Sequence, residues 1–138
     1  MRRSLVLAAF TLAVACGSNP TTNNPPPSPF AVAVEGTPSS STAPNGDVTI
    51  GIQLKVTEKA TGDTATNHNV ILQVTAGATT PTVPATNGLG RAIFTWLVPA
   101  ADATPSGTQT IAFCAPATAT GTICGTNLNG TQAYHHTF

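Results

Sequence analysis

The stretch DVTIGIQLKVT, residues 47–57, decides the fold class of this chain. Apolar side chains occupy every second position, and polar residues or glycine lie between them. Successive side chains of a β-strand point to opposite faces, so this alternation predicts a strand with one face in a hydrophobic core. The residues expected on that face are Val48, Ile50, Ile52, Leu54 and Val56.

Other segments of the chain repeat this period of two. Residues 69–75 and 90–98 show it most clearly, with Val70, Leu72 and Val74 inward in the first and Ala92, Phe94 and Trp96 inward in the second. Weaker strand candidates cover residues 30–35, 109–114, 121–125 and 133–138, with turn-forming sequences at 43–46, 60–63, 87–88 and 127–130. No segment carries a sustained helical stripe, and about seven short strands favour an all-β sandwich of two sheets.

The chain begins with the features of an export signal. Arg2 and Arg3 precede an apolar run over residues 5–15, in which Thr11 is the single polar residue, and Cys16 follows it. A positive end, a short apolar stretch and small residues before a cleavage point are typical of a signal peptide. The run of about eleven residues is shorter than the roughly 20 that a membrane-spanning helix needs. We therefore expect an exported mature chain without a transmembrane span.

The residues LAVAC, 12–16, resemble a bacterial lipobox. The resemblance implies cleavage before Cys16, acylation of this cysteine and a durable anchor, because more than one acyl chain holds a protein stably on a membrane. The alternative is ordinary signal-peptidase cleavage near Ala15. Residues 17–29, rich in Pro, Asn and Thr, predict an extended linker. By resemblance to enterobacterial lipoproteins, Gly17 in place of aspartate favours the outer membrane or the cell surface.

Charged side chains are sparse. They make up 7% of the sequence, and the formal net charge is zero at pH 7. Removal of Arg2 and Arg3 with the signal leaves five acidic residues against Lys55, Lys59 and Arg91. Nucleic-acid binding depends on clustered basic side chains that neutralise phosphates, so we expect no nucleic-acid partner.

Once Cys16 is assigned to the anchor, Cys114 and Cys124 remain. Two thiols separated by a turn-forming stretch can pair in an oxidising compartment, and we predict a disulfide between them. The alternative is a pair of buried thiols whose Cβ vectors diverge. A closed zinc site needs four ligands, so this pair is a weak candidate for metal binding.

Three short steps occur in order along the strand pattern: Val56-Thr57-Glu58, Thr75-Ala76-Gly77 and Gly90-Arg91-Ala92. Together they resemble bacterial Ig-like domains of the invasin and intimin type over residues 30–113. The resemblance implies an Ig-like β-sandwich that serves as a spacer, adhesive or interaction module and has no catalytic residue. The sequence after Phe113 departs from the family pattern, and the chain carries one such domain rather than several in tandem.

The polar side chains give little support to catalysis or metal binding. His68 lies in a polar connector and is expected to be solvated, while the adjacent His135 and His136 would point to opposite faces of a strand. The serines at 39–41 lie between prolines, lack the Gly-x-Ser-x-Gly elbow of hydrolases and predict a flexible loop. We therefore predict no catalytic residue, no metal site and no cofactor.

Trp96 admits two interpretations. It continues the face of Ala92 and Phe94 and so predicts a core anchor, whereas an exposed Trp96 or Tyr134 could stack on a sugar ring. The leading expectation is a non-enzymatic envelope lipoprotein that serves adhesion, protein interaction or structural display. Its partners would be the membrane, through the lipid anchor, and another envelope or host protein or a polysaccharide. The alternatives are a carbohydrate-binding module and a small envelope hydrolase or metal-binding protein.

These expectations divide the chain into three parts. Residues 1–15 form the signal peptide, residues 16–29 the acylated cysteine with its linker, and residues 30–138 the Ig-like domain.

Overall fold

The computed structural model describes residues 28–124 and 132–138. Within these residues the chain forms eight strands and no helix, which confirms the all-β prediction. The strands are β1 (Phe30–Val34), β2 (Ser39–Thr42), β3 (Val48–Glu58), β4 (Ile71–Val74), β5 (Ala78–Thr80), β6 (Arg91–Val98), β7 (Thr108–Cys114) and β8 (Ala133–Thr137). No helix in this described part is long and apolar enough to cross a membrane.

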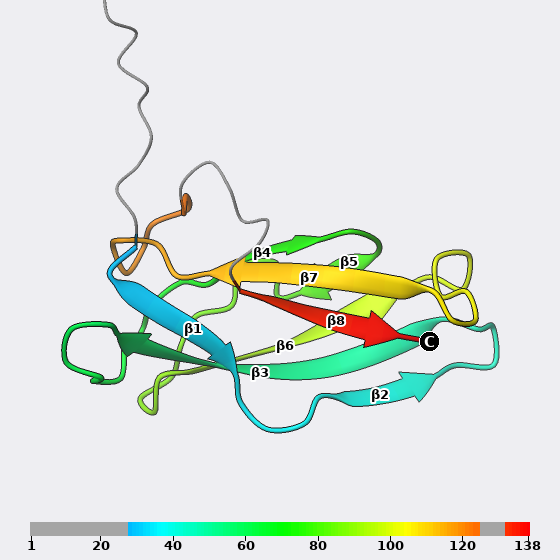
Figure 1. Cartoon of the computed structure of the whole chain (residues 1–138), viewed down its shortest axis with the longest axis horizontal. Coiled ribbons are helices and arrows are strands. Elements are labelled where there is room, and N and C mark those ends of the chain that lie inside the picture. The colour runs from blue at the N-terminus through cyan, green and yellow to red at the C-terminus, as the bar shows by residue number, and fades with distance from the viewer. Residues whose placement is uncertain (1–27, 125–131) are drawn as a thin grey trace, which may run out of the picture.

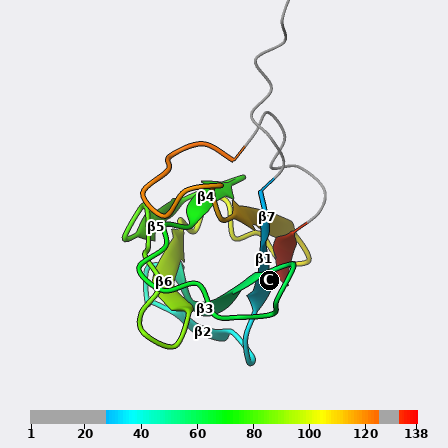
Figure 2. The same ribbon diagram turned by 90° about the vertical axis from the view of Figure 1, so that its left-hand side faces the viewer.

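The strands build two antiparallel sheets (Figure 1). One sheet has the order β1-β3-β6-β5, with β2 also pairing with β3, and the other has the order β4-β7-β8. Figure 2 views the strands nearly end on and shows β4 and β7 opposite β2 and β3. Constant-type immunoglobulin domains have this same arrangement, ABED in one sheet and CFG in the other. The predicted Ig-like sandwich is therefore confirmed.

The core lies between the two sheets and is dominated by β3 and β6. Along β3 every second residue from Val48 to Val56 is buried, and Ala92, Phe94, Trp96 and Val98 are buried along β6. Antiparallel pairing of the two strands places Ile52 opposite Phe94 and Ile50 opposite Trp96. Burial of a large apolar side chain contributes roughly 1.5–3 kcal/mol, so this strand pair supplies much of the stability of the sandwich.

The glycines of the steps Thr75-Ala76-Gly77 and Gly90-Arg91-Ala92 both have backbone conformations that favour glycine. Gly77, in the turn between β4 and β5, has φ +78°, and an added Cβ would lie 1.9 Å from the carbonyl oxygen of Leu97. Gly90, just before β6, has φ +70°, and its added Cβ would lie 3.0 Å from the carbonyl oxygen of Val56. Positive φ and close backbone contact explain why these turns require glycine.

Several sequence expectations need correction. The strand expected at 121–125 is absent from residues 121–124, which follow an irregular path. β2 and β5 were not expected, and the serines at 39–41 belong to β2 rather than to a flexible loop. Their hydroxyl side chains show no apolar alternation, so only the pairing of Ser39–Thr42 with Val48–Gly51 reveals this strand. The turn expected at 127–130 and the segments at 1–27 lie outside the described residues.

Candidate functional site

Cys114 and Cys124 form the predicted disulfide, with their Cα atoms 6.2 Å apart. Cys114 is the last residue of β7, and the bond closes the segment 114–124 that follows it. The bond therefore fixes this segment at the end of β7. The proposed acylation site, Cys16, lies outside the described residues.

His68 is buried rather than solvated, contrary to the sequence-based expectation. Only 3% of its surface is exposed, and its Nε2 lies 2.8 Å from the carbonyl oxygen of Pro116 in the disulfide-closed segment. Its ring also packs against that of Phe30, with 4.2 Å between the centroids. The main-chain N–H of His68 donates to Thr86 Oγ1. This histidine therefore joins three parts of the chain that are distant in sequence.

Asn69 strengthens the same attachment. Its main-chain N–H donates to the carbonyl oxygen of Ala119 at 2.7 Å, and its Nδ2 donates to that of Gly121 at 3.3 Å. Both acceptors lie inside the disulfide-closed segment. The disulfide and the residues 68–69 thus restrain this segment from two sides.

We expect the double variant Cys114→Ser and Cys124→Ser to lower the free energy of unfolding by about 2–3 kcal/mol. Loss of a crosslink between residues 10 apart in sequence raises the entropy of the unfolded chain by this order. Denaturant unfolding of the oxidised wild type and the variant measures the difference, and reduced wild type serves as the control. Rapid alkylation of the unreduced wild type at both thiols would contradict the disulfide.

Trp96 is the core anchor that its strand position predicts. Its side chain is fully buried, and its Nε1 donates to the carbonyl oxygen of Ala76 at 2.8 Å. The interpretation of Trp96 as an exposed sugar-stacking platform is therefore wrong. Tyr134 is half-buried and packs against the core, and its hydroxyl lies 3.2 Å from His136 Nδ1. Its ring therefore presents only part of its surface to a ligand.

The adjacent histidines of β8 lie on opposite faces of the strand, as predicted. His135 is exposed, with Nδ1 2.8 Å from Thr110 Oγ1, whereas His136 is half-buried beside Tyr134 and Phe138. Among residues 28–124 and 132–138, no three His, Cys, Asp or Glu side chains are grouped so as to hold a metal ion. The histidines of this described part therefore do not converge on one site.

A carboxylate on the outer face of the larger sheet has a structural role. Glu35 Oε2 accepts hydrogen bonds from Arg91 Nε and Gln53 Nε2, both at 2.6 Å, and Oε1 accepts one from Arg91 Nη2 at 3.0 Å. The hydrogen bonding of Arg91, aided by Gln53 and the positive charges of Arg91 and Lys55, holds the pKa of Glu35 below its usual value against a smaller opposing effect of burial. This cluster links the end of β1 to β3 and β6. A shallow hollow of about 330 Å³ lies next to it, over Gly51.

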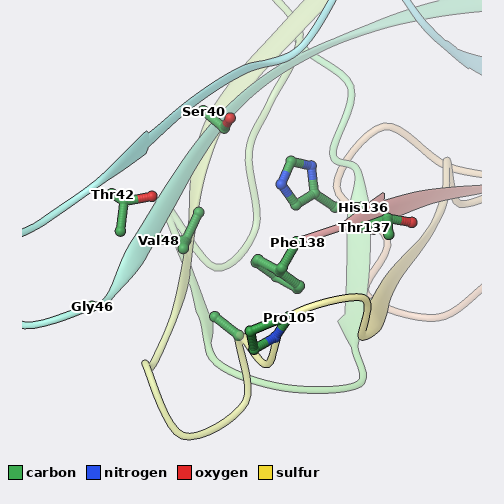
Figure 3. Close-up of a pocket in the computed structure, with 9 residues that line it drawn as sticks. Ser40, Thr42, Gly46, Val48, Pro105, His136, Thr137 and Phe138 are labelled. Carbon is green, nitrogen blue, oxygen red and sulfur yellow. The ribbon is translucent and has the colours of Figure 1, made fainter.

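A concave feature lies between the free side of β2 and β8 (Figure 3). We call it the β2–β8 groove; it has a volume of about 390 Å³. It is lined by Ser40, Thr42 and Val48 on one side and by Pro105, His136 and Phe138 on the other. The rings of His136 and Phe138 pack edge to face, 4.9 Å apart. None of the described lining residues is Asp, Glu, Lys or Arg.

Sequence reasoning missed this groove for an identifiable reason. Its two walls come from β2 and β8, whose residues are nearly a hundred positions apart in the chain. The alternation of Tyr134, His136 and Phe138 on one face of the last strand was visible, but the opposite wall of hydroxyl residues was not.

Comparisons with protein-family models, with curated proteins and with solved structures found no match for this chain. The site therefore has to be interpreted from its own geometry.

Proposed function

We propose that this chain is an exported, lipid-anchored protein of the bacterial envelope whose Ig-like domain is a non-enzymatic interaction module. The observation that carries the interaction role is the β2–β8 groove, a hollow whose described lining lacks Asp, Glu, Lys and Arg and which is bordered by two strands at the edges of their sheets. Exposed strand edges are the places where sheet proteins add a segment of another chain. Adhesion or display at the cell surface would use such an edge.

The position of the groove agrees with this role. Phe30, where the domain begins, pairs with Glu58 at the last residue of β3, whereas Val48 in the groove is the first residue of β3. A strand rises about 3.3 Å per residue, so the two ends of β3 lie roughly 33 Å apart. A tether that enters at Phe30 would leave the groove at the end of the domain that faces away from the membrane (Figure 1).

The anchor is tested on the full chain expressed in a Gram-negative host. We expect the wild type in the membrane fraction, with an intact mass that shows acyl chains on a protein beginning at Cys16. The Cys16→Ala variant should lack the acyl mass and should no longer have the mass of a chain that begins at residue 16. The Ser18→Ala variant, changed two residues away, should behave as the wild type. A wild-type chain cleaved at another position and free of acyl mass would contradict the anchor.

A second readout on the same cells tests the interaction role. A photo-reactive phenylalanine replaces either Thr42, an exposed residue that lines the groove, or Thr61, an exposed residue just beyond the opposite end of β3. The proposed function expects crosslinked products from position 42 and none from position 61. Equal labelling from both positions, or labelling only from 61, would remove the groove as the interacting surface.

A further inference from the structure

We infer that the β2–β8 groove binds an extended, uncharged polypeptide segment, which adds as a strand to the free edge of β8. This inference rests on the proposed function and specifies the chemistry of the partner. It is carried by the hydrogen-bond register of β8, by the opposite wall of the groove and by the lack of Asp, Glu, Lys and Arg in its described lining.

The register of β8 shows which of its main-chain groups are free. The N–H of Phe138 donates to the carbonyl oxygen of Gly107, and the N–H of Phe113 donates to that of Gln132. Main-chain groups of an antiparallel strand alternate in direction, so the groups of Tyr134 and His136 also face β7. Those of Ala133, His135 and Thr137 point away from β7, and β7 is the single strand neighbour of β8 within the described residues.

The opposite wall of the groove presents a second row of main-chain groups. The N–H of Ala43 donates to the carbonyl oxygen of Asp47, which makes 41–49 and 39–51 the next hydrogen-bonded pairs of β2 and β3. The main-chain groups of Ser40 and Thr42 therefore point away from β3. Donors and acceptors that repeat every second residue match the backbone of an extended polypeptide. A sugar or an acyl chain does not offer this repeat.

The hollow determines the side chains that such a segment would carry. An added strand points every second side chain to the same side, so one set would enter the groove and the other would face solvent. Val48 and Phe138 offer apolar contact, and Ser40 and Thr42 offer hydroxyls. A charged side chain would lose its hydration there, and the described lining has no Asp, Glu, Lys or Arg side chain to pair with it. Small apolar or hydroxyl side chains therefore fit the inward positions.

A second copy of this chain fits the groove less well. Pairing of β8 with β8 of another copy would satisfy main-chain groups, but the inward side chains Tyr134 and Phe138 already pack against the core of their own domain. The hollow would stay empty in such a dimer. A separate segment with a free inward face fills both the edge and the hollow.

The test uses the purified full-length mature protein in detergent and capped seven-residue peptides. The first peptide alternates valine with serine; the second has the same sequence with N-methyl groups on alternate amides; the third replaces the valines with aspartate. We expect the first peptide to shift the amide resonances of Ala133, His135 and Thr137. The methylated peptide should bind at least about tenfold more weakly because it lacks several main-chain N–H donors, and the aspartate peptide should bind at least about tenfold more weakly because its carboxylates would lose their hydration in the groove.

Two protein variants separate main-chain pairing from side-chain contact. Thr137→Pro removes an N–H that points away from β7, so the pairing of β7 with β8 is retained while strand addition is blocked. Thr137→Val loses the same hydroxyl but keeps the N–H. The proposal expects at least about a fivefold loss of affinity for the proline variant and wild-type affinity for the valine variant.

Four results would overturn the proposal. The first three are the failure of the first peptide to bind at millimolar concentration, equal binding of the methylated peptide, and equal binding by Thr137→Pro. The fourth is a concentration-dependent dimer that Thr137→Pro abolishes, which would make a second copy the occupant instead. None of these results touches the anchor or the crosslinking readout, so failure of this inference is distinguishable from failure of the proposed function.

Discussion

Replacement of Trp96 by alanine is expected to lower the free energy of unfolding by about 3–5 kcal/mol. Trp96 is fully buried, and its removal leaves a large cavity between the two sheets. The substitution also removes the indole N–H that donates to the carbonyl oxygen of Ala76, which adds the cost of an unpaired buried acceptor. Denaturant unfolding followed by far-ultraviolet circular dichroism measures the change without depending on the fluorescence of the deleted side chain.

Leu97→Ala is the matched control for this measurement. Leu97 follows Trp96 on β6 but points to the outer face, where 45% of its surface is exposed. Its truncation should cost less than about 1 kcal/mol, because substitutions of exposed residues have small effects. Trp96→Phe should fall between the two, since it keeps a buried ring and loses the hydrogen bond. Equal costs for Trp96→Ala and Leu97→Ala would contradict the burial of this side chain.

Replacement of His68 by alanine is expected to cost about 3–4 kcal/mol. The substitution removes the hydrogen bond to the carbonyl oxygen of Pro116 and the packing against Phe30, and both losses occur in a site that is almost fully buried. The amide of Asn69, which donates to Ala119, should also exchange its hydrogen faster as the disulfide-closed segment loosens. Equilibrium unfolding and amide hydrogen exchange measure the two effects.

Two variants show how much of the lost stability comes from the hydrogen bond of His68 and how much depends on its buried position. His68→Gln places an amide N–H near the position of Nε2, so it should recover part of the lost stability. His135→Ala removes an exposed histidine and should change the unfolding free energy by less than about 1 kcal/mol. A solvated His68 would instead give equally small effects for His68→Ala and His135→Ala.

The sequence predicted the elements whose side chains alternate strongly. β3 and β6 each bury every second residue, and both were located by this pattern with their inward faces correctly assigned. Alternation is a local property of the chain. A period of two identifies a strand and its buried face clearly when the alternating apolar residues are large. The disulfide was also predictable, because two cysteines remained once the first had been assigned to the anchor.

Short polar elements were not predictable in this way. β2 contains three serines and a threonine, and its strand geometry depends on pairing with β3 rather than on its own side chains. The expected strand at 121–125 contained suitable residues, but the segment 121–124 is part of the stretch fixed by the disulfide, His68 and Asn69. Local propensity therefore gave way to tertiary contacts in both places.

The sequence by itself determined the all-β class and the inward residues of the two main strands, and it favoured a buried Trp96 and the pairing of Cys114 with Cys124 over their alternatives. Tertiary structure decided between those alternatives, and it alone showed that His68 is buried and that β2 and β8 border a groove. The physical reason is that the first group of features depends on neighbouring residues, whereas the second depends on contacts between distant segments. Periodicity is written in neighbouring residues, whereas the surroundings of His68 and the walls of the groove come from segments far apart in the chain.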